Sequence, residues 1–233
     1  MKKQITVSLF LLICTILADG FIVKAIATQK YSKDTAMPFS YLLSENYYVA
    51  AEPPDLSKVV LTVKDLPPGF EDMSDQAESF KKQLKDERKF KPESVFAFQK
   101  SDDKKFQLIL GFTMKLATRI EQASFDSSIT KEDFSQYFLK GLNERSQKEF
   151  TKINPLPLGE MIGEASAGWV TKGKIENLPV SIDIAIFRRQ NLGAFLVTLY
   201  IDGDSPSITI ADIARKFDSR IVQLMPPAST QPQ

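Results

Sequence analysis

Two serine–lysine pairs have the spacing of a known catalytic arrangement. Ser79 precedes Lys82 by three residues, and Ser128 precedes Lys131 by the same interval. On a helix this spacing places a lysine amine one turn from the serine hydroxyl, where it can act as a general base. The Ser-Asp-Asn and Lys-Thr-Gly elements of such hydrolases are missing. Residues 171–173 contain the residues of the second element, but in the wrong order, Thr-Lys-Gly. Solvated helix-face residues are therefore the favoured interpretation, and a serine–lysine hydrolase is the least favoured function.

Composition excludes most other side-chain catalysis. The chain has no histidine, which removes Ser-His-Asp triads, imidazole bases and most zinc sites. Its one cysteine, Cys14, lies near the start of the chain, so the remainder offers no thiolate nucleophile. We therefore expect no enzyme activity and no cofactor.

The segment Asp202-Gly203-Asp204 is a candidate cation site. Two carboxylates beside a glycine can hold a hard cation such as calcium, which prefers oxygen ligands. The further spaced ligands and the closing glutamate of an EF-hand loop do not follow. A turn that leads into a helix is the favoured interpretation, and no metal site is predicted.

Phe187, Arg188 and Arg189 form the candidate partner-binding group. An arginine pair at a hairpin tip can clamp a carboxylate or phosphate, but a solvated turn is the favoured interpretation. Phe187 interrupts the alternation of its strand, which leaves room for an exposed ring. An exposed aromatic beside arginines is typical of protein–protein hot spots, although the core is the usual place for phenylalanine.

The first 27 residues have the layout of a secretory signal peptide. Lys2 and Lys3 precede an uncharged, mostly apolar run at residues 5–17, and Ala25-Ile26-Ala27 matches a cleavage site. The run is shorter than the roughly 20 residues that span a bilayer. We expect cleavage before Thr28, with an uncleaved anchor as the alternative. Lipidation of Cys14 is not expected, because the bulky Ile13 precedes it.

The remaining chain divides into three parts. Residues 28–56 read as a partly disordered arm that ends near Pro53-Pro54, and residues 224–233 form a proline- and glutamine-rich tail. Residues 57–223 make one domain. The net charge of the whole chain is only +1, which gives no electrostatic footprint for nucleic acid.

Alternating or β-branched apolar residues predict the strands of this domain. They occur at residues 58–63, 95–100, 106–116, 165–174, 180–186 and 195–201, with a proline-containing edge strand within 154–158. Helical spacing and capping residues predict helices at 76–87, at 119–127, from a cap at Thr130 to about 147, and after a cap at Thr209.

These elements predict an α+β fold. Short links between neighbouring strands imply antiparallel pairing, and helices must cover the apolar faces. We expect a mostly antiparallel, twisted sheet of about six to seven strands with helices packed on its faces.

Three stretches carry a family resemblance: residues 66–70, which read Leu-Pro-Pro-Gly-Phe, the turn at 187–194, and the last helix at 212–221. They resemble exported bacterial proteins of unknown function that are common in photosynthetic bacteria. The order of elements over residues 57–223 also resembles the PsbP-like sandwich of extrinsic photosystem II proteins and certain extracytoplasmic sensor domains. No catalytic residue comes with the resemblance, and the chain lacks the histidines that bind metal in some PsbP-type proteins.

Together these observations predict an exported, non-catalytic domain. Its place is the periplasm, the thylakoid lumen or the exterior, where it engages a protein partner of the envelope or lumen and can associate peripherally with a membrane. The alternative is a domain that binds a small molecule or lipid between sheet and helices.

Overall fold

The computed structural model describes residues 55–88, 91–102, 105–130, 132–145, 150–160, 162–175 and 177–226. The predicted signal peptide at residues 1–27 lies outside this part of the chain, as do nearly all of the predicted arm and most of the predicted tail.

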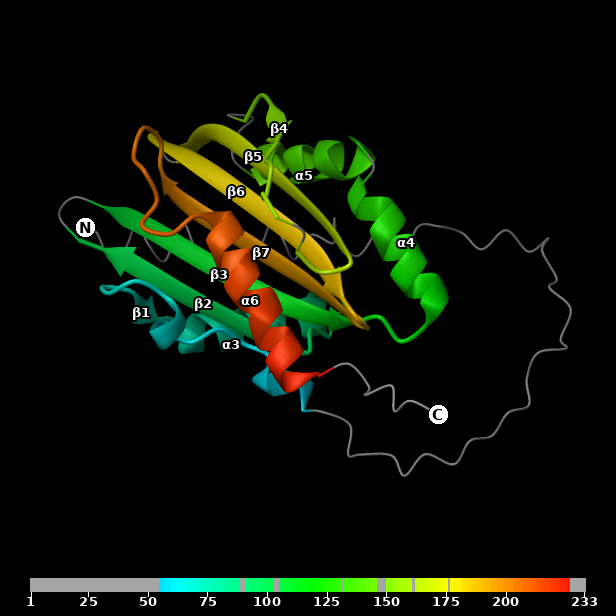
Figure 1. The fold of residues 1–233 in the computed structure, drawn as a ribbon. Coiled ribbons are helices and arrows are strands. Elements are labelled where there is room, and N and C mark those ends of the chain that lie inside the picture. Colours follow the sequence, from blue (N-terminus) through cyan, green and yellow to red (C-terminus); the bar gives the residue numbers. More distant parts are fainter. Residues whose placement is uncertain are drawn as a thin grey trace, which may run out of the picture.

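A single seven-stranded antiparallel sheet forms the centre of the molecule (Figure 1). Its strands are β1 Glu71–Asp72, β2 Ser94–Ser101, β3 Phe106–Lys115, β4 Ile153–Pro155, β5 Ala165–Ile175, β6 Leu178–Arg189 and β7 Leu192–Ile201. They lie in the order β1-β2-β3-β7-β6-β5-β4, so β1 and β4 form the edges. The predicted α+β class and antiparallel pairing are confirmed.

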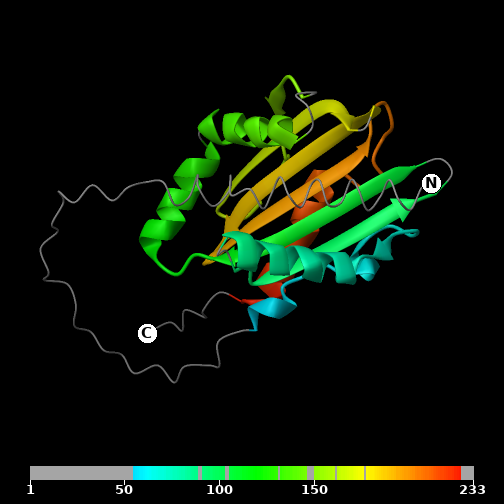
Figure 2. The same ribbon diagram turned by 180° about the vertical axis from the view of Figure 1, so that it is seen from behind.

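Helices cover both faces of the sheet. Their bounds are α3 Ser74–Arg88, α4 Arg119–Thr130, α5 Glu132–Arg145 and α6 Ile210–Leu224, with 3-10 turns at Leu56–Lys58 and Val63–Asp65. Helix α6 crosses one face in Figure 1, and α3, α4 and α5 lie on the opposite face in Figure 2. Each strand can therefore bury apolar side chains on both sides.

Helix α6 follows its sequence prediction closely. The Thr209 hydroxyl accepts a hydrogen bond from the Asp212 backbone N–H at 3.1 Å, which caps the helix where predicted. The apolar stripe of the helix is buried, and its members are Ile210, Ile213, Ala214, Phe217 and Ile221.

The predicted strand at residues 58–63 is wrong. This segment lies between two 3-10 turns, and Val59 and Leu61 are buried against the α6 side of the sheet. The Thr62 backbone N–H donates to the Asp65 carboxylate at 2.7 Å, which closes the second turn. The β-branched pattern therefore reflects an extended segment that packs on the sheet without pairing into it.

Thr130 does not cap a helix as predicted. Its hydroxyl donates to the carbonyls of Asp126 and Ser127 at 3.1 Å each, so Thr130 is the last residue of α4. Helix α4 itself begins with a reciprocal pair in which Thr118 and Glu121 cap one another, as expected.

Candidate functional site

Phe187 is a core residue, so the possibility of an exposed ring at this position is wrong. Strand β6 continues to Arg189, so Phe187 falls in the alternation of Asp183 and Ala185 toward α6. Its side chain is 0% exposed and makes an edge-to-face contact with Phe217 of α6, with ring centroids 6.1 Å apart. Helix α6 is distant in sequence, which is why the local pattern did not reveal this burial.

Arg188 pairs with carboxylates of the protein itself. Its guanidinium donates to both oxygens of Asp126 at 2.7 Å each and to Glu164 at 2.7 Å. The hydrogen bonds that Arg188 donates to Asp126 raise the pKa of Arg188 above its ordinary value. These contacts fasten α4 and the start of β5 to the end of β6.

Arg189 makes the equivalent contact on the other face. Its Nε donates to Asp218 of α6 at 2.7 Å, and its Nη2 donates to the second oxygen of the same carboxylate. An external anion would have to displace Asp218 from Arg189 or Asp126 from Arg188. The two arginines therefore link the sheet to helices α4 and α6 through ion pairs. This structural role differs from both the predicted anion clamp and the predicted solvated turn.

The hydroxyls of both candidate serine nucleophiles donate to backbone carbonyls of their own helices. The Ser79 hydroxyl is exposed and donates to the Asp75 carbonyl at 2.9 Å, and the Ser128 hydroxyl donates to the Ser124 carbonyl at 2.7 Å. These are local helix contacts. Lys131 lies outside the described residues.

Asp202 accepts hydrogen bonds from neighbours of its own sheet. Lys172 Nζ lies 2.6 Å from its carboxylate, and Ser181 donates at 2.9 Å. The hydrogen bond from Lys172 lowers the pKa of Asp202. Among the described residues, no group of three or more potential metal ligands gathers here or elsewhere.

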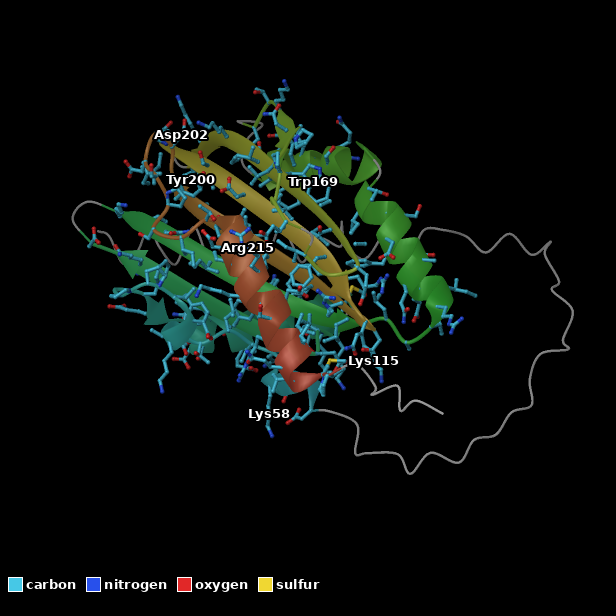
Figure 3. All side chains as sticks on the ribbon, viewed as in Figure 1. Lys58, Lys115, Trp169, Tyr200, Asp202 and Arg215 are labelled. Atoms are coloured by element: carbon cyan, nitrogen blue, oxygen red, sulfur yellow. The ribbon has the colours of Figure 1, made fainter. Side chains whose placement is uncertain are left out.

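Asp183 is a buried carboxyl group that sequence reasoning missed. It lies on β6, on the same face of the sheet as Ala185 and Phe187, and is only 6% exposed. Burial raises its pKa to about 6. The Tyr200 hydroxyl lies 3.3 Å from both of its oxygens. Burial and the nearby Asp183 raise the pKa of Tyr200 to about 12. Figure 3 shows Tyr200 and Asp202 at this end of the sheet. Asp183 alternates with isoleucines along β6, and this local pattern does not show that its face of the sheet is covered by α6.

A pocket lined by described residues lies at the β4–β5 edge of the sheet. Its volume is about 630 Å³. Helices α4 and α5 border it on one side, and the segment after β4 borders it on the other. Its lining residues are Ile129, Thr130, Ser135, Gln136, Ile153, Pro155, Leu156, Pro157, Leu158, Gly159, Glu160, Ser166, Ala167, Gly168 and Trp169.

Among the described residues that line this pocket, Glu160 is the only ionisable one, and the others are apolar, small or neutral polar. It therefore offers shape, apolar surface and backbone groups, without a paired acid and base. This combination suits binding better than catalysis.

No protein-family model matches the chain, and no curated protein or solved structure is significantly similar to it. Within the described residues, no helix is long and apolar enough to cross a membrane. The function must therefore be argued from the pocket and the sheet edge themselves.

Proposed function

We propose that this protein is an exported, non-catalytic binding domain that engages an extended segment of a protein partner at the open edge of β5. The observation that carries the proposal is the pocket of about 630 Å³ along that edge, whose described lining residues include a single ionisable one. The signal-like residues 1–27 and the resemblance to exported bacterial domains support the location outside the cytoplasm.

The edge of β5 is only partly covered by its neighbour. Strand β4 pairs with three of the eleven residues of β5, namely Trp169, Val170 and Thr171. One step further, the Leu156 N–H donates to the Gly168 carbonyl at 2.8 Å. Residues two apart in a strand point their backbone groups to the same side, so Ser166 presents its N–H and C=O to this edge.

The chain leaves β5 at the point where Ser166 would be paired. Pro157 lacks an N–H donor, and Gly159 adopts a positive φ of 82°, which turns the segment away. In the described residues, no backbone group outside the β5–β6 ladder forms a hydrogen bond with Ser166. An extended peptide can therefore add to β5 at Ser166, as in other complexes formed by strand addition.

The side-chain content of the pocket indicates what the partner segment carries. Trp169 and Ile129 supply apolar surface, while Gln136 and Ser166 supply neutral polar groups. Glu160 disfavours an acidic ligand. We therefore expect a partner segment with apolar or small side chains and no acidic residue at this point.

Site-specific photo-crosslinking tests the proposal. A photoreactive residue at Gln136, which is exposed and lines the pocket, should cross-link one partner protein in the native envelope fraction. The same residue at Lys82 on the exposed face of α3 is the control and should not capture that partner. Failure to capture a partner from Gln136, or equal capture from both positions, would overturn the proposal.

A proline substitution separates strand addition from simple apolar docking. Ser166→Pro removes the outward N–H while the ladder with β6 is retained, and Ser166→Ala keeps the N–H. We expect the cross-link from Gln136 to be lost in Ser166→Pro and kept in Ser166→Ala. Fluorescence of Trp169, the only tryptophan, reports whether each variant is folded. A cross-link that survives in folded Ser166→Pro would rule out pairing at this residue.

A small-molecule ligand is the second candidate. The pocket volume falls in the range of roughly 300–1,000 Å³ that is usual for such sites. Native mass spectrometry of protein purified from its own envelope would detect a co-purifying molecule. Its loss in Ala167→Trp, which fills the pocket, together with no cross-linked protein, would favour this function.

A further inference from the structure

Arg220 differs from the other partly buried arginines of the domain. Arg188, Arg189 and Arg215 each form an ion pair with a carboxylate of the protein. Arg220 is also partly buried, but no ion pair or hydrogen bond involves it in the part of the chain that the structure describes. Its Nε is buried without an acceptor. A buried N–H without an acceptor is costly, because it loses its hydrogen bond to water without gaining another.

Arg220 lines a surface pocket between α6 and the second 3-10 turn. The pocket has a volume of about 280 Å³ and is separate from the β5 edge. Its lining residues are Asp65, Arg215, Lys216, Ser219, Arg220 and Gln223. Five of the six come from α6 at positions that share one face of the helix. Figure 3 labels Arg215 on this helix.

The lining residues of this pocket carry more positive than negative charge. It has three cationic residues against one carboxylate, that of Asp65. Asp65 already accepts hydrogen bonds from the N–H and hydroxyl of Thr62 at 2.7 and 2.9 Å and forms no ion pair with Arg220. Arg215 is partly engaged by Asp212 and by the Leu158 carbonyl, so Arg220 and Lys216 carry the unneutralised charge.

We propose that this pocket is a phosphate-binding site. Arginine is suited to phosphate, since its planar fork donates two parallel hydrogen bonds to two oxygens. Lys216 supplies a second cation, and Ser219 and Gln223 supply neutral donors. The several oxygens of a phosphate group can accept from donors in different directions. The phosphate belongs either to a free small molecule or to the headgroup of an anionic lipid.

Binding of inorganic phosphate to the protein at residues 28–233 tests this site. At constant ionic strength, a titration followed by NMR should shift the amide signals of residues 216–223. Arg220→Gln should weaken binding about tenfold, which corresponds to the loss of one charge-assisted hydrogen bond. Arg220→Lys should be intermediate, because the charge is kept and the fork is lost. Lys82→Gln, an exposed α3 position, is the matched control and should bind like the wild type.

A second arm identifies the source of the phosphate. Co-sedimentation is compared between phosphatidylcholine vesicles and vesicles that also contain phosphatidylglycerol. Binding to the anionic vesicles that is lost in Arg220→Gln would assign a lipid headgroup, and phosphate binding without vesicle binding would assign a free phosphate compound. No phosphate-dependent shift at residues 216–223, or equal shifts in wild type and Arg220→Gln, would overturn the site. Neither result depends on the β5 edge.

Discussion

At the scale of single residues, Arg188 links α4 and the segment before β5 to the end of β6. Its side chain is 14% exposed and holds Asp126 of α4 and Glu164 before β5. Arg188→Gln should lower the free energy of unfolding by about 2 kcal/mol, because two carboxylates lose their charged donor. Urea unfolding measures the change. Arg119→Gln, at an exposed α4 position, should change stability by less than about 0.5 kcal/mol. Equal effects of the two substitutions would contradict the fastening role.

Asp183 makes stability depend on pH. Its pKa is raised to about 6 in the folded state from an ordinary value of 3.8, so the folded protein holds this proton more tightly than the unfolded chain. The stability linked to this proton is fully present below about pH 4 and is lost as the pH rises through about 6. Lys172 and Tyr200 are the charged and titratable groups that act on it.

Asp183→Asn should therefore stabilise the protein at about pH 7.5, by up to roughly 3 kcal/mol, since one pKa unit corresponds to about 1.4 kcal/mol. At about pH 4 the two proteins should have nearly equal stability. Urea unfolding of both proteins at each pH gives the comparison, and other titrating groups cancel in the difference. A difference that is the same at both pH values would show that Asp183 titrates normally.

At the scale of elements, close packing of strands β2 and β3 beneath α6 depends on Gly111. A Cβ added there would lie 2.2 Å from the Phe96 ring and 2.8 Å from Leu196. Gly111→Ala should cost about 2 kcal/mol, because buried rings must shift. Gly203→Ala meets no atom within 4 Å and strains only a backbone φ of 92°, for about 1 kcal/mol. Thermal unfolding compares the stabilities of the two variants. A larger loss of stability in Gly203→Ala than in Gly111→Ala would contradict the packing argument.

Local sequence patterns predict some elements of this fold and not others. The β2–β3 hairpin was predictable, because its alternation is local and its turn is short. Residues 58–63 were not, because β propensity cannot distinguish a paired strand from an extended segment lying on a sheet. The burial of Phe187 and Asp183 depends on α6, which arrives from elsewhere in the chain.

The candidate pocket illustrates the same limit. Its proline-rich edge segment was predicted at residues 154–158, and β4 is indeed an edge strand. Strand β4 ends after three residues, and Pro157 and Gly159 then turn the chain away from β5. That α4 and α5 meet this segment to form a pocket follows from tertiary packing. No spacing in the sequence connects these segments.

At the scale of the whole molecule, burial is divided between the two faces of one sheet. One hydrophobic cluster lies under α3, α4 and α5, and the other lies under α6 and residues 56–70. Strands β6 and β7 contribute to both clusters, with alternate residues facing each side. Loss of either layer would expose an apolar face of the central strands, so the two layers should unfold together.

This arrangement predicts that residues 55–226 fold as one independent unit. A protein limited to these residues should unfold in one transition, with the same urea midpoint as residues 28–233. The reason is that all members of both described hydrophobic clusters lie within residues 55–226. Trp169, only 7% exposed in the folded state, reports the transition by fluorescence. Far-ultraviolet circular dichroism should give the same midpoint, since it reports helices on both faces. A lower midpoint for residues 55–226 would show that residues 28–54 or 227–233 contribute to the core, and two separate transitions would show that the layers are independent.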